Sequence, residues 1–370
     1  MLRRLKEAAS VRSLANPVGL YIHIPFCKKR CAYCDFYSSF FESGLVRQYL
    51  SALKKEMKKW GGKLDRPVDT VYIGGGTPSL LGKSAGTLIK AAKNYFDVTK
   101  DAEITVESNP ESCTESFLSS VLENGANRLS LGVQSFNDDE LRKLSRIHSA
   151  KEARNAYCTA KSMGFKNISL DLMMGLPNSD LKSLKHTLDA FLRLSPQHIS
   201  AYILKIEENT LFEKQNTLIP PDDEQAEQYM FVCETLEKNG YEHYEISNFS
   251  KPSFYSKHNM KYWMDEEYLG IGPSAASFLD GKRFYYKADL HKFMQEPETY
   301  FDGHGGSDDE KIMLGLRTSR GADISAFVAP DDKKLIKFKN AGFINLDYPR
   351  VSLTDRGMLL SNQIITELIS

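Results

Sequence analysis

The run Tyr21-Ile-His-Ile-Pro-Phe-Cys27-Lys-Lys-Arg-Cys31-Ala-Tyr-Cys34 determines the interpretation of this chain, because it places three cysteines close together after an apolar, strand-like segment. Their spacing is C-x3-C-x2-C. A structural zinc site needs four ligands, and the sequence has no fourth Cys or His at zinc-finger distance. Three thiolates suit a 4Fe–4S cluster that keeps one iron open to an outside ligand. The sequence therefore predicts such a cluster, with surface thiols or an incomplete zinc site as the alternatives.

This stretch resembles the radical S-adenosylmethionine (SAM) superfamily, whose signature has this spacing and an aromatic residue, here Tyr33, before the third cysteine. The longer run is similar to the HemN/HemW branch of that superfamily, the oxygen-independent coproporphyrinogen oxidases and their relatives. The resemblance implies that the open iron chelates the amino and carboxylate groups of SAM. It also implies that an electron from the cluster cleaves SAM to a 5′-deoxyadenosyl radical.

The composition is that of a globular protein without a charge bias. Lys and Arg number 48, as do Asp and Glu, so we expect no nucleic-acid partner. No apolar run approaches the roughly 20 residues that span a bilayer, and residues 1–18 read as an N-terminal extension without a secretory signal. Cys113, Cys158 and Cys233 share no spacing, and we interpret them as buried small hydrophobes. Reduced thiols and an oxygen-labile cluster indicate the cytoplasm.

An alternation of β-rich and helical patterns fills residues 19–240. The β-rich runs are 19–25, 70–74, 103–107, 128–133, 167–173 and 198–204, and the helical patterns are 46–60, 84–95, 115–124, 138–163, 180–194 and 223–239. Such alternation predicts an α/β protein with a parallel sheet. Right-handed connections favour an incomplete (β/α)6 barrel with its site at the carboxyl ends of the strands. An open doubly wound sheet is the alternative, and the radical SAM resemblance favours the partial TIM-like barrel.

The pattern changes after residue 240. We expect residues 241–303 to cover the barrel, with a strand at 241–248, a polar loop and a tight segment at 268–276. After a hinge at 303–307, residues 304–370 are expected to form a small winged-helix-like α+β domain. Its predicted elements are helices at 309–316, 333–341 and 357–368 and a hairpin at 343–353. Because this domain has no basic recognition helix, we interpret it as a lid or docking domain.

Candidate cofactor residues follow the predicted strands. The loop Gly75-Gly76-Thr77 exposes backbone N–H groups, and Glu107 stands at a strand end, where a carboxylate points into a barrel site. Each of these alone is compatible with a structural role, and their recurrence at successive strand ends favours a site. The resemblance implies that SAM is contacted by Tyr21, Tyr33, Gly75, Gly76, Thr77, Glu107, Gln134, Arg146 and Asp171.

Two features separate this chain from the oxidases of the branch. HemN-type oxidases carry a further cysteine two residues after the third, where this chain has Phe36, and they have a longer extension before the position of Tyr21. The run His258-Asn259-Met-Lys-Tyr262-Trp263 resembles the haem-binding motif H-N-x-x-Y-W of haem-chaperone members. Imidazole is a common ligand of haem iron, and aromatic rings can cover a porphyrin face.

The predicted function is therefore that of a haem chaperone, which binds haem and passes it to acceptor haemoproteins such as respiratory proteins at a membrane. The resemblance implies a 4Fe–4S cluster, SAM and haem as cofactors, assigns no catalytic residue and leaves a homodimer open. The alternative is an enzyme, an oxygen-independent coproporphyrinogen III dehydrogenase that decarboxylates propionates. A zinc-stabilised metabolic barrel is a third hypothesis.

Overall fold

The computed structural model describes residues 16–325 and 332–369, so most of the expected extension 1–18 lies outside the described residues. Parallel strands form a partial barrel within these residues. In sheet order they are β1 (Val18–Ile24), β4 (Val68–Gly75), β5 (Val98–Ser108), β6 (Arg128–Gln134), β7 (Ile168–Met174) and β8 (His198–Ile203). All six predicted strands and their parallel pairing are confirmed.

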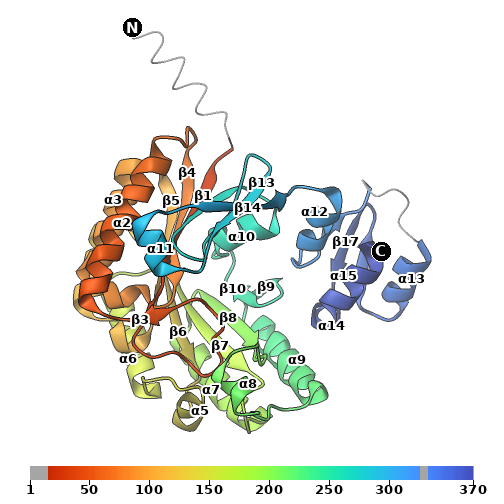
Figure 1. Ribbon diagram of the computed structural model, residues 1–370. Helices are drawn as coiled ribbons and strands as arrows, with labels where there is room; N and C mark the ends of the chain where they lie inside the picture. The colour runs from red at the N-terminus through yellow and green to blue at the C-terminus, as the bar shows by residue number, and fades with distance from the viewer. Residues whose placement is uncertain (1–15, 326–331, 370) are drawn as a thin grey trace.

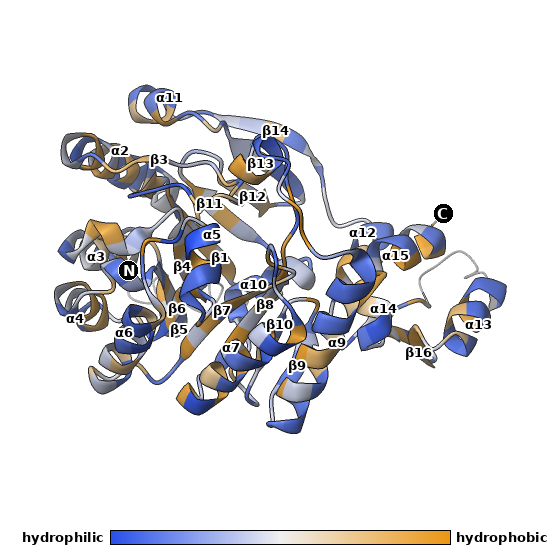
Figure 2. Ribbon diagram, turned by 90° about the horizontal axis from the view of Figure 1, so that it is seen from below, coloured by the Kyte–Doolittle hydropathy of each residue, from blue (hydrophilic) through white to orange (hydrophobic). Residues whose placement is uncertain are grey.

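Helices cover the outside of these strands, as Figure 2 shows. They are α2 (Ser43–Gly61), α3 (Lys83–Tyr95), α4 (Glu115–Glu123), α6 (Ala150–Ser162), α7 (Leu181–Leu194) and α9 (Asp222–Lys238). Because side chains pack on both faces of the sheet, strands such as β6 and β7 are almost wholly buried, and their sequences RLSLGVQ and ISLDLMM are rich in apolar residues with polar residues between them. Gly125, Gly164 and Gly240 follow three of the helices with positive φ, as expected for helix-ending glycines.

One predicted helix, 138–163, is wrong, because it is broken into α5 (Asp138–Lys143) and α6. Ser145 has φ of 59°, which stops the first helix. Ser149 then starts the second with a capping box, in which its side chain and that of Glu152 satisfy each other's backbone N–H groups. The break between them brings Arg146 and His148 inward.

Further strands extend the barrel sheet at both edges. The predicted strand 241–248 is instead a hairpin of β9 (Glu242–Glu245) and β10 (Asn248–Ser250), which pairs with β8. At the other edge β11 (Tyr268–Ile271) runs parallel to β1 and is followed by antiparallel strands. These are β12 (Ala276–Leu279), β13 (Lys282–Tyr286) and β14 (Thr299–His304), with α11 (Leu290–Gln295) between the last two. The sequence-based expectation of a tight segment missed this extension, because the pairing of β11 with β1 is long-range and the Asp280-Gly281 turn that joins β12 to β13 was overlooked.

Residues 308–325 and 332–369 form a C-terminal module beside the barrel (Figure 1). Its elements are α12 (Asp308–Gly315), β15 (Ala322–Asp323), α13 (Asp332–Asn340), β16 (Ile344–Asp347), β17 (Arg350–Leu353), α14 (Asp355–Leu359) and α15 (Ser361–Ile369). The predicted hairpin is confirmed as β16–β17, but the predicted last helix is split at Leu360. Ile312, Leu316 and Val351 belong to the same hydrophobic core as the barrel, so the module is packed against it. The domain boundaries expected at 240 and 303 stay predictions.

In the part of the chain that the structure describes, no helix is both long and apolar enough to cross a membrane.

Candidate functional site

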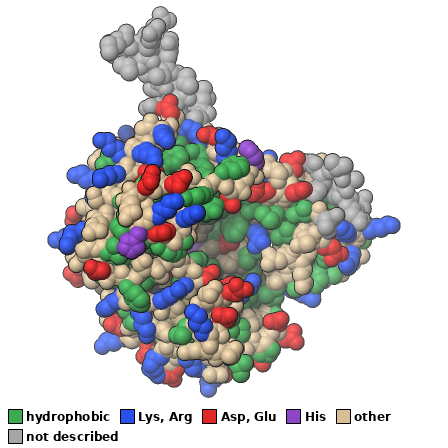
Figure 3. All heavy atoms as spheres, in the orientation of Figure 1, with side chains coloured by type: hydrophobic (Ala, Val, Ile, Leu, Met, Phe, Trp, Pro, Cys, Tyr) green, Lys and Arg blue, Asp and Glu red, His purple; other side chains and the backbone are tan. Residues whose placement is uncertain are grey.

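A cavity of about 580 Å³ opens among the carboxyl ends of the barrel strands and reaches into the barrel. Its lining includes, among the described residues, every site residue predicted from the sequence except Trp263. These are Tyr21, Cys27, Cys31, Tyr33, Cys34, Gly75, Gly76, Thr77, Glu107, Gln134, Arg146, Asp171, His258, Asn259 and Tyr262. In the view of Figure 3 the molecule is hollowed near its centre, and hydrophobic side chains gather between the hollow and the C-terminal module.

The loop that carries the three cysteines is fixed at both ends. At its start, β2 (Phe26–Cys27) pairs with β3 (Ser39–Phe40). In its middle, Ala32 is buried, donates its N–H to the Leu144 carbonyl and accepts from the N–H of Phe212. These backbone hydrogen bonds position the loop so that all three thiols line the cavity.

Donors already point at two of the sulfur atoms. Arg146 Nη1 lies 3.4 Å from Cys31 Sγ, and Thr77 Oγ1 lies 3.7 Å from Cys27 Sγ. Burial raises the pKa of the Cys34 thiol to about 11. A bound metal would hold the thiol as a thiolate instead, since metal binding releases the proton. The donor set of three sulfurs with second-sphere hydrogen bonds therefore fits an iron–sulfur cluster.

Gly76 lies so close to the cysteine loop that it cannot carry a side chain. A Cβ at this position would lie 2.7 Å from the Phe26 carbonyl oxygen and 3.0 Å from Cys27 Sγ. The backbone that follows β4 therefore lies directly against the cysteine loop. The loop 75–77 forms one side of a space into which the amino-acid end of a cofactor could be placed.

Two half-buried carboxyl groups, Glu107 and Asp171, line the same cavity. Glu107 accepts hydrogen bonds from the Tyr72 hydroxyl at 2.8 Å and from the Gly75 N–H at 3.0 Å. Burial, with the nearby charge of Asp171 adding to it, raises the pKa of Glu107 to about 7 despite these bonds. Burial likewise raises the pKa of Asp171 to about 6. Carboxyl groups of perturbed pKa in a cleft are typical of a functional site and suit a cationic ligand.

Arg146 links the cysteine wall to the strand ends. Its Nη2 donates to Asn109 Oδ1 at 2.7 Å and to the Gly132 carbonyl at 2.6 Å. Burial would lower the pKa of Arg146, but the charges of Tyr33, Cys31 and Glu111 raise it above its usual value. The guanidinium therefore stays charged beside the thiols.

Sequence reasoning missed Tyr72 and Asn109, which hold Glu107 and Arg146 in place. Asn109 stands two residues after Glu107, so its position at the same strand end was the available signal. For Tyr72 the sequence offered no signal. Gln134 lies at the end of β6 with φ of 71°, a strained backbone that is common at functional sites.

The run H-N-x-x-Y-W forms the helix α10 (Lys257–Trp263), and the expectation that it lies on a polar loop is wrong. His258 is buried, with Nδ1 2.8 Å from Thr70 Oγ1 and Nε2 2.9 Å from the Tyr262 hydroxyl. Burial, aided by the positive charges of Lys261 and Arg128, lowers the pKa of His258 to about 3. The imidazole is therefore neutral, as a metal ligand must be.

Trp263 is turned away from the cavity. Its ring lies 5.9 Å from the guanidinium carbon of Arg317, which follows α12.

One prediction about the other cysteines is wrong, because Cys158 is exposed, whereas Cys113 and Cys233 are buried as predicted.

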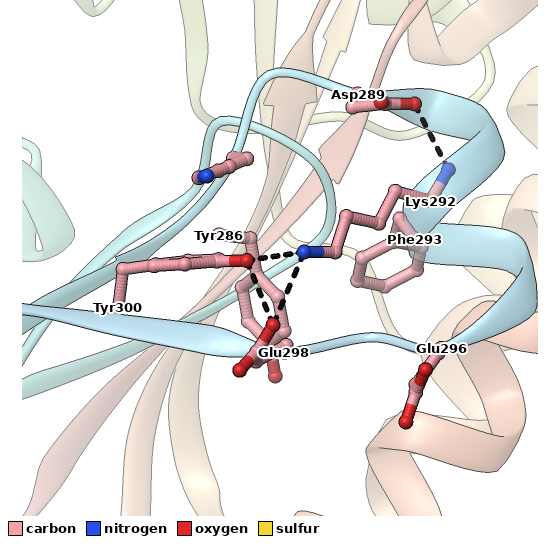
Figure 4. A pocket seen from close by; sticks show the side chains of 8 residues that line it. Tyr286, Asp289, Lys292, Phe293, Glu296, Glu298 and Tyr300 are labelled. Atoms are coloured by element: carbon pink, nitrogen blue, oxygen red, sulfur yellow. Dashed lines mark hydrogen bonds and ion pairs between the residues drawn. The ribbon is translucent and has the colours of Figure 1, made fainter.

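A second, much smaller pocket lies between α11 and the strands β13 and β14 (Figure 4). There Lys292 Nζ lies 3.1 Å from Glu298, which also accepts from the Tyr300 hydroxyl at 2.7 Å. Lys292, Glu298 and Tyr300 are bonded to one another and the pocket is small, so the large cavity is the candidate cofactor site.

A partial parallel barrel whose mouth carries three cysteines at this spacing defines a radical SAM protein. Residues 21–191 match the Radical SAM superfamily. The structure of coproporphyrinogen III oxidase (HemN) from Escherichia coli is similar, with a TM-score of 0.83 and 23% identity over 100% of this chain and 93% of that one. At that identity the likeness shows the fold alone.

Comparison with related proteins identifies the family within this superfamily. The heme chaperone HemW of Bacillus subtilis (strain 168) is 36% identical over 367 residues, which cover 93% of this chain and 97% of that protein. The heme chaperone HemW of Haemophilus influenzae is 38% identical over 296 residues, or 78% of this chain and 76% of that protein. The chain belongs to the HemW family within the radical SAM superfamily.

Proposed function

We propose that this chain binds haem and delivers it to acceptor haemoproteins, with a 4Fe–4S cluster and SAM held in the barrel. The observation that carries the proposal is the match to proteins named heme chaperones over nearly the whole chain. Phe36, in place of the further cysteine of the oxidases, supports the same reading. We propose that the protein acts in the cytoplasm, since all six cysteines are free thiols. Its proposed acceptors include membrane-associated respiratory proteins.

In this proposal Cys27, Cys31 and Cys34 hold the cluster, and the residues around them hold SAM. Cluster and SAM together supply one-electron chemistry when they are bound. Glu107 would accept hydrogen bonds from the SAM ammonium, and the backbone of Gly75 and Gly76 would lie along its amino-acid end. The other proposed SAM contacts are Tyr21, Tyr33, Thr77, Gln134, Arg146 and Asp171.

Haem is proposed to meet His258, Asn259 and Tyr262 from the cavity. His258 is neutral, and its Nε2 can bind iron once the Tyr262 hydroxyl moves away. Aromatic rings flank it, with 5.2 Å between ring centroids for Tyr72 and 5.3 Å for Tyr262. A porphyrin needs such flat apolar surfaces together with an axial ligand.

The test uses protein reconstituted anaerobically with iron and sulfide and supplied with SAM and a reductant. Haem is titrated and followed by its Soret band, and carbon dioxide release from coproporphyrinogen III is measured on the same sample. We expect haem binding in the wild type, weaker binding or a shifted Soret band in His258→Ala, and no carbon dioxide. His186→Ala, which changes an exposed histidine on α7, is the matched control and should bind like the wild type.

Steady conversion to protoporphyrinogen would overturn the chaperone proposal in favour of the decarboxylase. Equal haem binding by His258→Ala and His186→Ala would contradict the assignment of His258 as the haem ligand.

A further inference from the structure

A second cluster of metal-ligating side chains lies outside the cofactor cavity, where the C-terminal module meets the barrel. Cys233 on α9, His243 on β9 and Asp355 at the start of α14 offer one ligand atom each, and these atoms lie within 4.8 Å of one another. His243 Nδ1 is 2.7 Å from Asp355 Oδ1. Figures 1 and 2 both place α14 beside α9. Segments more than 100 residues apart in the chain thus bring sulfur, nitrogen and oxygen donors to one point.

The cluster is enclosed but not sealed. Cys233 is fully buried and the His243 side chain is 2% exposed, whereas the Asp355 side chain is 27% exposed. An ion could therefore enter past the carboxylate. The other ring nitrogen of His243, Nε2, faces the Tyr229 hydroxyl at 3.4 Å and the Ile246 carbonyl at 3.3 Å, so Nδ1 is the nitrogen beside Asp355.

The arrangement also resembles a Cys–His–Asp nucleophilic site, but its chemistry does not allow one. A nucleophilic thiol must reach its substrate, and Cys233 has no exposed surface. Burial, with the negative charge of Asp355, raises the pKa of this thiol, which is the opposite of activation. A half-buried carboxylate beside a buried thiol instead favours a cation between them, because the cation stabilises both anionic forms.

We propose that Cys233, His243 and Asp355 bind a divalent transition-metal ion, zinc by ligand class, which ties the C-terminal module to the barrel. Thiolate, imidazole and carboxylate are the three side-chain ligands of zinc. Zinc–ligand bonds of about 2.0 to 2.3 Å place ligand atoms on a tetrahedral ion roughly 3.5 Å apart, which the observed spacing allows with small side-chain shifts. Water completes the tetrahedron.

The ion would take ligands from α9 and β9 on the barrel side and from α14 on the module side, so it would link the two parts. The backbone also crosses nearby in an isolated antiparallel bridge of Glu245 with Thr318, made by the bonds from the Ser319 N–H to the Tyr244 carbonyl and from the Ile246 N–H to the Arg317 carbonyl. Binding energy at such a point adds to the stability of the docked module, because the separated parts cannot supply all three ligands.

The experiment uses the full chain with its iron–sulfur cluster already reconstituted, so that the cluster thiols are occupied. The protein is equilibrated with zinc, desalted, and assayed for zinc and iron by mass spectrometry. We expect about one zinc per chain in the wild type and in Cys158→Ser, which changes an exposed cysteine elsewhere on the barrel. Asp355→Asn and Cys233→Ala should bind zinc at least about tenfold more weakly with iron content unchanged.

Cobalt gives the second measurement. Cobalt bound in place of zinc should show a thiolate charge-transfer band that Cys233→Ala lacks and Cys158→Ser keeps. Zinc should raise the melting temperature of the wild type but not that of Asp355→Asn. Failure of the wild type to retain zinc, or equal zinc retention by Asp355→Asn, would overturn the proposal, and neither result bears on haem binding.

Discussion

His258 Nε2 and the Tyr262 hydroxyl lie 2.9 Å apart, one helical turn from each other on α10. The second ring nitrogen is 2.8 Å from Thr70 Oγ1, so both nitrogens of the imidazole have partners within the protein. Iron can therefore reach Nε2 only after the tyrosine hydroxyl moves away. Within the H-N-x-x-Y-W run, Tyr262 therefore forms a hydrogen bond with the proposed haem ligand, His258, that must break before iron binds.

Removing that hydroxyl should strengthen haem binding. In Tyr262→Phe the ring stays but Nε2 is free, and one neutral hydrogen bond of about 1 kcal/mol no longer competes with iron, which corresponds to about fivefold in affinity. Haem titration followed at the Soret band measures the change, with Tyr285→Phe as the control for an exposed tyrosine. If Tyr262→Phe loses as much affinity as His258→Ala, the hydroxyl itself contacts the porphyrin and this account of α10 is wrong.

Trp263 gives a separate prediction about the direction from which haem approaches. Its ring lies near Arg317 and outside the cavity, although the motif alone suggested a stacked porphyrin. We expect Trp263→Ala to leave haem affinity within about twofold of the wild type, since about 1 kcal/mol or more would be lost with a stacked aromatic pair. The same titration tests it. A loss as large as that of His258→Ala would place haem on the outer side of α10.

The barrel could be predicted from the sequence because its signals are local. Each strand is a short, mostly buried segment rich in apolar residues, and glycines such as Gly125 and Gly164 end helices, so short windows of sequence sufficed. The break at Ser145 depends on a single positive φ inside a helical pattern. The helix α10 has only seven mostly polar residues, and its start at Ser256 is a weak signal on its own. Neither leaves a periodic pattern to detect.

The site was predictable only in part, for a similar reason. Cysteine spacing and strand-end positions are visible along the chain, but partners such as Tyr72 for Glu107 and Asn109 for Arg146 come from other strands or turns. The strand β11 likewise pairs with β1 far away in the chain, whereas β12 and β13 form a local hairpin over Asp280-Gly281, a turn signal that the sequence did offer. Which residues meet across a barrel is set by its closure, not by any one segment.

Gly76 should be essential for cluster assembly. A Cβ there would clash with the Phe26 backbone and touch Cys27 Sγ, so Gly76→Ala must displace the cysteine loop. We expect reconstituted Gly76→Ala to hold well under half the iron of the wild type. Gly44→Ala is the control, because its Cβ would meet only the flexible Glu42 side chain at 3.6 Å. Wild-type iron content in Gly76→Ala would contradict the close approach.

The three cysteines have a prediction of their own. The wild type should bind about four irons per chain and show an electron paramagnetic signal that shifts when SAM is added. The triple variant Cys27→Ser, Cys31→Ser, Cys34→Ser should lose this iron, while Cys158→Ser should retain it. Full iron content in the triple variant would sink the cluster assignment.

Glu107 should make SAM binding depend on pH. Its pKa is raised from 4.5 to about 7, so between these values the folded protein keeps a proton that the unfolded chain has lost. The free energy of unfolding therefore falls as pH rises through that window, because the folded state binds more protons there. The ionised carboxylate, present above about pH 7, is the form that accepts from the SAM ammonium.

We therefore expect SAM affinity to rise from pH 6 to pH 8, by up to about tenfold per pH unit below the pKa, since each unit lowers the ionised fraction tenfold. Glu107→Gln keeps the shape but cannot ionise, so it should bind SAM more weakly at pH 8, show a flat pH profile and retain its iron. Calorimetric titration of the reconstituted protein measures both. Glu123→Gln, on the outer helix α4, is the control and should follow the wild type. A Glu107→Gln profile that still rises with pH would assign the titration to another group, with the neighbouring Asp171 the first to examine.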